Sequence, residues 1–395
     1  MKHFVCYLLT ICLFSCTAPI RPAEEKTSAI RKGNYDKIIE DRTRVISLNP
    51  KNATAYYERG VAYDMKGQLD RAIEDLNKAI ALNPEYATAY NSRGVVLDKK
   101  GQIDQAIEDY TSAISLDHNF ALSYSNRGGA YNRKGQFDRA IEDFNRAIVS
   151  EPALVDAYVG RGISYKNKGQ VERAIEDYNK AISLSPNYVD AYYSRGNVYE
   201  IKGQHKQAIE DYNKAISLDP NHALAYHGRG VVYDMAGDPD RALEDFNKAI
   251  SLNPNLAEAY SSRGIVYGKK GQFEREIEDH TRAISLNPNS AVFYSNRCGA
   301  YLKKLHYDQA IEDCTKAISL DPNFARAYFG RGVAYTDRGQ LDRAIVDYDK
   351  AISLAPNFAA AYYGRGHAYQ KIGQLGRAES DFNRACELGY KAACR

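Results

Sequence analysis

The sequence contains no tryptophan, only 12 prolines and no excess of either charge. Lysine plus arginine number 53 and aspartate plus glutamate number 50, so the formal charge is only +3. This balance excludes the basic footprint that is typical of a nucleic-acid-binding chain. The sequence also lacks a glycine-rich phosphate loop, a serine nucleophile motif and a histidine pair at the helical spacing of metal ligands. We therefore expect a non-enzymatic protein with no metal, no cofactor and no nucleic acid partner.

Long apolar runs are absent as well, and the apolar stretch at residues 4–14 is too short to span a bilayer comfortably. Lys2 precedes it and small residues follow it, which is typical of a signal peptide, here residues 1–15. The stretch ends in Leu13-Phe14-Ser15-Cys16, which resembles the bacterial lipobox, although Phe14 is bulkier than usual. The resemblance implies a lipid on Cys16, with residues 16–28 as the tether.

The predicted location is therefore the cell envelope, with the protein anchored in a membrane by its lipid. In a Gram-negative organism this would be the outer membrane, because Thr17 rather than Asp follows the cysteine. An ordinary secretory signal, cleaved near Thr17-Ala18, is the alternative and would give a secreted or periplasmic protein.

A period of 34 residues occupies most of the remaining chain, and two ladders of opposite charge follow it. The arginines are Arg59, Arg93, Arg127, Arg161, Arg195, Arg229, Arg263, Arg297, Arg331 and Arg365. Sixteen residues after each stand Asp75, Asp109, Asp143, Asp177, Asp211, Asp245, Asp279, Asp313, Asp347 and Asp381. Matched ladders predict bidentate, partly buried ion pairs between packed helices rather than a basic track for phosphate.

Each unit has the pattern of two helices joined by a turn, as residues 53–86 illustrate. Tyr56 and Gly60 are four residues apart and fall on one face of a first helix. Gly67 supplies the backbone freedom that a tight turn requires, and Pro84 follows the second helix. Neither helix can bury its apolar face alone, so neighbouring units must stack.

With Gly at the eighth place, Tyr at the eleventh, Ala at the twentieth and Pro at the thirty-second, the units resemble tetratricopeptide repeats. Tyr replaces the usual Trp at the fourth place and Arg replaces Leu at the seventh. Ten copies cover residues 53–391, a degenerate half repeat covers 29–52, and 392–395 form a tail. The resemblance implies an all-α, right-handed solenoid of helix–turn–helix repeats that binds partner peptides or domains in a concave groove.

In such repeats the second, fifth, ninth and twelfth places face the groove, and here these places vary while the scaffold places do not. The candidate groove-binding residues are Tyr57, Asp64, Asp98, Asp190, Tyr193, Asn197, His227, Asp234, Arg326, Phe329, Tyr363 and His367. The clamp that binds the C-terminal carboxylates of heat-shock chaperones requires Lys at the fifth place. No repeat has it, so we do not expect that partner.

Two cysteine pairs and one departure from the repeat pattern leave alternatives open. Cys386 and Cys394 have a spacing that resembles the disulfide of Sel1-like repeats, and two free thiols are the alternative. Cys298 and Cys314 are expected to be small apolar core side chains, with a disulfide as the minority interpretation.

Glu276 and His280, one turn apart, replace an alanine and an aromatic residue. They could pair with each other at a flexible seam, or they could reflect drift.

The sequence thus predicts an envelope scaffold for protein partners. A glycan- or peptidoglycan-binding module, with groove tyrosines stacking on sugar, is one alternative. A cytoplasmic scaffold with an uncleaved N-terminus is another.

Overall fold

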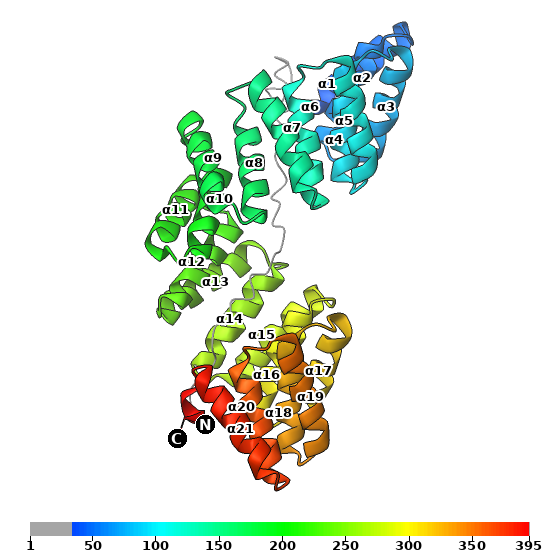
Figure 1. The fold of residues 1–395 in the computed structure, drawn as a ribbon. Coiled ribbons are helices and arrows are strands. Elements are labelled where there is room, and N and C mark those ends of the chain that lie inside the picture. The colour runs from blue at the N-terminus through cyan, green and yellow to red at the C-terminus, as the bar shows by residue number, and fades with distance from the viewer. Residues whose placement is uncertain (1–33, 395) are drawn as a thin grey trace. The chain divides into compact units, whose positions relative to one another are not determined.

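The computed structural model of the protein describes residues 34–394, which form α-helices joined by short turns (Figure 1). The predicted signal peptide, Cys16, the tether and Arg395 lie outside the described residues. Residues 34–394 contain no strand, and the predicted all-α fold of tandem helical repeats is confirmed. No helix in this part of the chain combines the length and apolar character needed to cross a bilayer.

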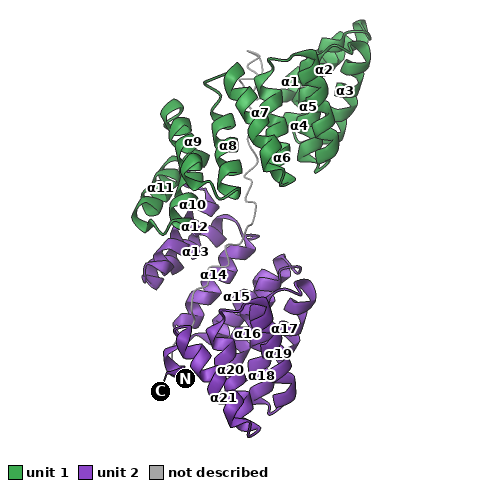
Figure 2. Cartoon of the chain, in the orientation of Figure 1, with its two compact units in different colours: residues 1–218 green, residues 219–395 purple. Residues whose placement is uncertain are grey.

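The chain divides into two compact units, residues 1–218 and 219–395 (Figure 2). The helices of the first unit are α1 Tyr35–Leu48, α2 Ala53–Met65, α3 Leu69–Leu82, α4 Ala87–Lys99, α5 Ile103–Leu116, α6 Ala121–Arg133, α7 Phe137–Ser150, α8 Val155–Asn167, α9 Val171–Leu184, α10 Val189–Ile201 and α11 His205–Leu218. Those of the second are α12 Ala223–Met235, α13 Pro239–Leu252, α14 Ala257–Lys269, α15 Phe273–Leu286, α16 Ala291–Lys303, α17 Tyr307–Leu320, α18 Ala325–Asp337, α19 Leu341–Leu354, α20 Ala359–Lys371 and α21 Leu375–Glu387, followed by the 3-10 helix η2 Lys391–Ala393.

The ten full repeats, numbered from residue 53, each supply one even-numbered and one odd-numbered helix from α2 to α21. The half repeat at 29–52 supplies α1, which stands in the place of a second helix. Even-numbered first helices of successive repeats contact one another within each unit, as α6 does with α8 and α16 with α18. Second helices make no comparable contact among the described residues. Each unit therefore curves with its first helices on the inner face.

A glycine sets the turn between the two helices of a repeat. Gly67 has φ of 70°, and its N–H donates to the Asp64 carbonyl at 2.8 Å where α2 ends. Leu305 adopts the same left-handed conformation, with φ of 61°, where other repeats have glycine. A side chain in this conformation costs about 1 kcal/mol, and Leu305 gains no burial in return because it is 65% exposed.

The core of each repeat depends on a ring lying against glycine. Tyr178 on α9 is fully buried, and a Cβ built on Gly162 of α8 would lie 2.6 Å from its ring. Core rings of some repeats also pack against the next repeat, as Phe144 does, because a Cβ on Gly160 of the following repeat would lie 2.3 Å from its ring. Glycine at these positions lets adjacent helices approach closely around one aromatic side chain.

All ten predicted arginine–aspartate pairs form, each joining the two helices of one repeat. In repeat 2, Arg93 Nε and Nη2 donate to the two carboxylate oxygens of Asp109 at 2.8 and 2.6 Å. Arg93 Nη1 also donates to Asn77 Oδ1 of the preceding repeat at 2.6 Å. The guanidinium lies 5.6 Å from the Tyr90 ring centroid. These hydrogen bonds to Asp109 raise the pKa of Arg93.

Two disulfides lie in the second unit. Cys298 and Cys314 are joined, with Cα atoms 5.6 Å apart, contrary to the favoured prediction of two separate apolar side chains. They occupy the eighth and twenty-fourth places, which are in direct contact in other repeats, as at Gly162 and Tyr178. The bond therefore fills the space that a ring fills elsewhere. The second disulfide joins Cys386 in α21 to Cys394 after η2.

We expect Arg93→Ala to lower the free energy of unfolding by about 3 kcal/mol, because it leaves the buried Asp109 carboxylate without its cation. Arg93→Lys should recover only part of this loss, since an ammonium cannot form the bidentate pair. Urea unfolding of the full chain measures both changes. Arg71→Ala, at an exposed arginine of repeat 1, is the control and should cost less than about 0.5 kcal/mol. Equal effects at both sites would contradict the prediction.

The inner face as a candidate binding site

The predicted groove residues lie on first helices in both units. Those of the first unit are Tyr57 and Asp64 on α2, Asp98 on α4, and Asp190, Tyr193 and Asn197 on α10. Those of the second are His227 and Asp234 on α12, Arg326 and Phe329 on α18, and Tyr363 and His367 on α20. The two units thus present separate sets of candidate residues.

Three of the predicted acids are fastened to the next repeat by ion pairs. Asp64 accepts from Lys99 Nζ at 2.7 Å, and Asp234 accepts from Lys269 Nζ at 2.7 Å. Asp98 is paired with Arg133. In each pair an acid at the twelfth place meets a base at the thirteenth place of the following repeat. These acids therefore join repeats, and their charge is largely neutralised before any partner arrives.

Repeat 7 makes the same link with different residues. Its twelfth place is Gly268, and a Cβ there would lie 2.4 Å from the carboxyl group of Glu276. Glu276 Oε1 accepts from Lys303 Nζ of repeat 8 at 2.7 Å. The carboxylate on the second helix thus replaces the missing acid of the first helix, and burial raises its pKa.

Glu276 and His280 do not pair with each other as the sequence suggested. The pairing partner of Glu276 is Lys303, and the Nδ1 atom of His280 lies 3.4 Å from Ser261 Oγ. His280 is 0% exposed, and burial lowers its pKa to about 3. The imidazole is therefore neutral at physiological pH and serves as the core ring of repeat 7.

Tyr193 and His227 are packed into the scaffold, and Asp190 lies partly buried beside a second acid. Tyr193 is buried with its ring 6.1 Å from Tyr212. Asp190 is partly buried, and its charge adds to burial in raising the pKa of Asp156. His227 Nε2 lies 3.0 Å from Ser262 Oγ, and burial lowers the pKa of His227 to about 4.

A hydroxyl and two acceptors meet on the inner face of repeat 5. Tyr212 Oη lies 2.7 Å from Asn197 Oδ1 and 2.8 Å from Glu200 Oε2. One hydroxyl proton cannot serve both acceptors, whereas a protonated Glu200 donates to Tyr212 and frees that proton for Asn197. Burial raises the pKa of Glu200 to about 7, which favours this neutral form. Glu200 stands at a twelfth place, which the sequence predicts to face the groove, whereas Tyr212 is not a predicted binding residue.

The aromatic candidates pair with rings at the end of the same repeat. Tyr57 lies 5.0 Å from Tyr86, and Phe329 lies 4.9 Å from Phe358, measured between ring centroids. Tyr363 lies 4.7 Å from Tyr390 and 4.5 Å from His367. These rings are half-buried, so each keeps part of its surface accessible.

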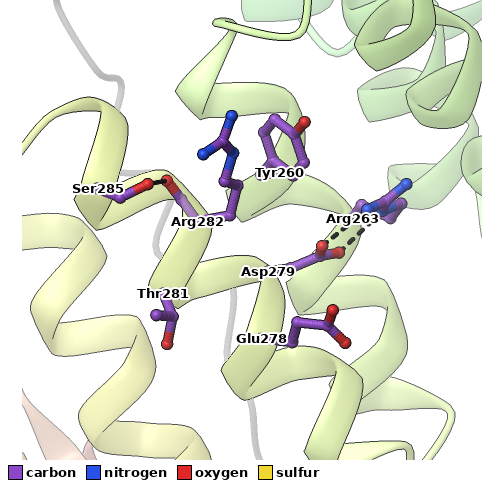
Figure 3. A pocket seen from close by; sticks show the side chains of 7 residues that line it. All are labelled: Tyr260, Arg263, Glu278, Asp279, Thr281, Arg282 and Ser285. Carbon is purple, nitrogen blue, oxygen red and sulfur yellow. Dashed lines mark hydrogen bonds and ion pairs between the residues drawn. The ribbon is translucent and has the colours of Figure 1, made fainter.

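A shallow depression on repeat 7 lies apart from these candidates (Figure 3). It is lined by Tyr260, Arg263, Glu278, Asp279, Thr281, Arg282 and Ser285, and the Arg263–Asp279 ion pair crosses it. The depression thus contains scaffold residues of the charge ladders. Across residues 34–394, no three His, Cys, Asp or Glu side chains are placed to bind a metal ion.

We expect Glu200→Gln to stabilise the chain at pH 8 but to change little at pH 4. The pKa of Glu200 is about 7 in the folded chain against an ordinary 4.5, so native stability falls as pH rises from about 4.5 to 7. Glutamine cannot ionise and avoids this loss, which is at most about 3 kcal/mol. Unfolding free energies at pH 4, 6 and 8 test this. Glu210→Gln, at an exposed carboxylate on α11, should remove no comparable pH dependence.

Models of tetratricopeptide repeats match most of the chain. Those described as "Tetratricopeptide repeat" match residues 43–74, 87–120, 121–153, 189–222, 223–256, 246–278, 291–324, 314–346 and 359–388. A model described as "TPR repeat" matches residues 65–101, 164–200 and 334–373. No curated protein sequence matches this chain.

Solved structures share the fold. A tetratricopeptide repeat protein from Parabacteroides merdae is 23% identical with a TM-score of 0.51, covering 67% of this chain and 97% of its own. The APC/C hetero-tetramer Cut9-Hcn1 gives a TM-score of 0.55 at 15% identity, covering 93% of this chain and 94% of its own. At these identities the likeness concerns the fold alone.

Proposed function

This chain belongs to the tetratricopeptide repeat family, and we propose that it is a non-enzymatic scaffold that binds protein partners on the inner face of its first helices. One observation carries the proposal. The Arg–Asp pairs are satisfied and the core rings are buried within the array, whereas half-buried rings such as Phe329 and the exposed Arg326 lie at variable inner-face positions. Aromatic and arginine side chains of this kind supply most of the affinity in protein interfaces.

A sugar-binding role has less support from the geometry. Stacking on a glycan requires an open ring face, and Tyr193 is buried against Tyr212. The remaining inner-face rings are paired at their repeat ends, as Tyr57 is with Tyr86, which leaves edges and partial faces. Such surfaces suit the side chains of a polypeptide.

The partner-binding proposal is tested with a photocrosslinking amino acid in place of Phe329, using the full chain in living cells. We expect one or a few proteins, identified by mass spectrometry, to crosslink at this position and then to bind the purified chain. The same probe in place of Val346, an exposed residue on α19, is the matched control. Identical products at both positions, or none above background at 329, would contradict the proposal.

We further propose that the protein is exported and anchored by a lipid on Cys16. Support comes from the lipobox-like sequence and from two disulfides, since disulfides persist in oxidising compartments outside the cytosol. The envelope is therefore the compartment in which the scaffold would gather its partners.

Mass spectrometry of the mature protein tests the anchor. We expect a chain that begins at a lipid-modified Cys16, and a Cys16→Ser variant that no longer fractionates with membranes. A mature chain beginning at Thr17 or later without lipid would favour plain secretion. An unmodified Met1 would refute export and favour the cytoplasmic alternative.

A further inference from the structure

The inner face changes its charge in the last three repeats. Their second, fifth, ninth and twelfth places carry no carboxylate, whereas earlier repeats place Asp156, Asp190 and Glu258 at such places. Arg326 is exposed and makes no ion pair with the residues described between 34 and 394. The only acid of its helix, Asp337, is eleven residues away at the last position of α18, about 16 Å along the axis.

A row of rings continues from Arg326. Phe329 lies one turn after it on α18 and contacts Phe358, and the ring of Tyr348 supports Phe329 from behind at 6.0 Å. In the next repeat Tyr363 contacts Phe382 at 5.7 Å. Core rings therefore hold these side chains, so little conformational freedom remains to be lost on binding.

Tyr390 completes the row from outside the helical pattern. It contacts Tyr363 as Phe358 contacts Phe329, but it follows its partner by 27 residues where Phe358 follows by 29. The chain turns early at Gly389, which has φ of 88°, and the Tyr390 N–H donates to the Ala385 carbonyl at 2.9 Å.

The Cys386–Cys394 disulfide closes the turn that carries Tyr390. It ties α21 to the residue after η2, and Ala393 of η2 is buried. No further helix follows to hold this segment among the described residues. The bond therefore restricts the turn that holds the ring of Tyr390 against Tyr363.

We propose that this end of the inner face, Arg326 with Phe329, Phe358, Tyr363 and Tyr390, binds an extended partner segment in which an acidic side chain lies close to an aromatic or aliphatic one. The inference rests on the proposed function and names its partner chemistry. The carboxylate pairs with the Arg326 guanidinium, and the apolar side chain lies against the rings. The Cys386–Cys394 disulfide is required for full affinity because it positions Tyr390.

Charge complementarity selects this occupant over a basic one. A lysine-bearing segment would bring a second cation beside Arg326, and the inner-face places of the last three repeats offer no carboxylate to receive it. A purely apolar segment would cover Arg326 without pairing it, which costs desolvation free energy.

The test uses the purified oxidised chain and pools of fluorescein-labelled heptapeptides, read by fluorescence anisotropy at low salt. One position is Glu, Gln or Lys, and a position two residues away is Phe, Leu or Ser. We expect the Glu pools with Phe or Leu to bind about tenfold tighter than the corresponding Lys or Ser pools. Equal affinities across the pools would overturn the proposal.

Single substitutions test which residues cause the preference for particular peptide pools. Arg326→Gln should abolish discrimination between Glu and Gln while keeping the preference for Phe over Ser. Arg343→Gln, the same charge change at an exposed residue of α19, should leave both preferences intact. Discrimination that survives Arg326→Gln would refute the role of this arginine.

The double variant Cys386→Ser/Cys394→Ser removes the disulfide without touching Cys298–Cys314, and Tyr390→Ala removes the ring alone. Both variants should bind the preferred peptide pool about fivefold more weakly, while circular dichroism shows that their helices are intact. Unchanged binding in the double variant would refute the positioning role of the disulfide.

The two proposals fail in different ways. If crosslinking at 329 captures a partner but the peptide pools are not discriminated, the scaffold function holds and this inference fails. If the pools are discriminated but no cellular protein is captured, the inference holds and the proposed function fails.

Discussion

The bidentate pair between an arginine on the first helix and an aspartate on the second fixes the geometry of every repeat. A planar guanidinium must meet a carboxylate in one orientation, so the pair sets helix separation and rotation together. Because the same arginine reaches the preceding repeat, as Arg93 does to Asn77, it also sets how repeats stack. Insertions would break this register, and none occurs across the ten repeats.

Because most polar side chains of the scaffold are already paired with one another, few of them remain available to a partner. Acids on the inner face are consumed by links between repeats, as Asp64 is by Lys99, and Glu276 preserves one such link where Gly268 removes the usual acid. The residue types at a link can change while the link itself is kept. The candidate binding groups are therefore side chains that keep part of their surface exposed to solvent after packing within the array. The main ones are Arg326 and the paired rings near the C-terminal end of the array.

The helices, the turns and the ion pairs could be predicted from the sequence, because each recurs in every repeat at a fixed spacing along the chain. It did not favour the Cys298–Cys314 bond, although sixteen residues is also the spacing of the Gly162–Tyr178 contact. Interactions across repeats were harder to predict, because Lys303 reaches Glu276 only after the helices stack. The binding residues themselves stay predictions, since a variable position indicates freedom from the scaffold and does not identify a ligand.

The Cys386–Cys394 disulfide connects the packing of the last repeat with the proposed binding surface. Among the described residues, α21 is followed by a short turn and the 3-10 helix η2. The Cys386–Cys394 bond restricts that turn, which places Tyr390 against Tyr363 on the inner face. The disulfide thus also shapes the aromatic surface that Tyr363 and Tyr390 form. If this surface binds the proposed partner, stability at this end and affinity for that partner are coupled through one covalent bond, which an oxidising compartment would maintain.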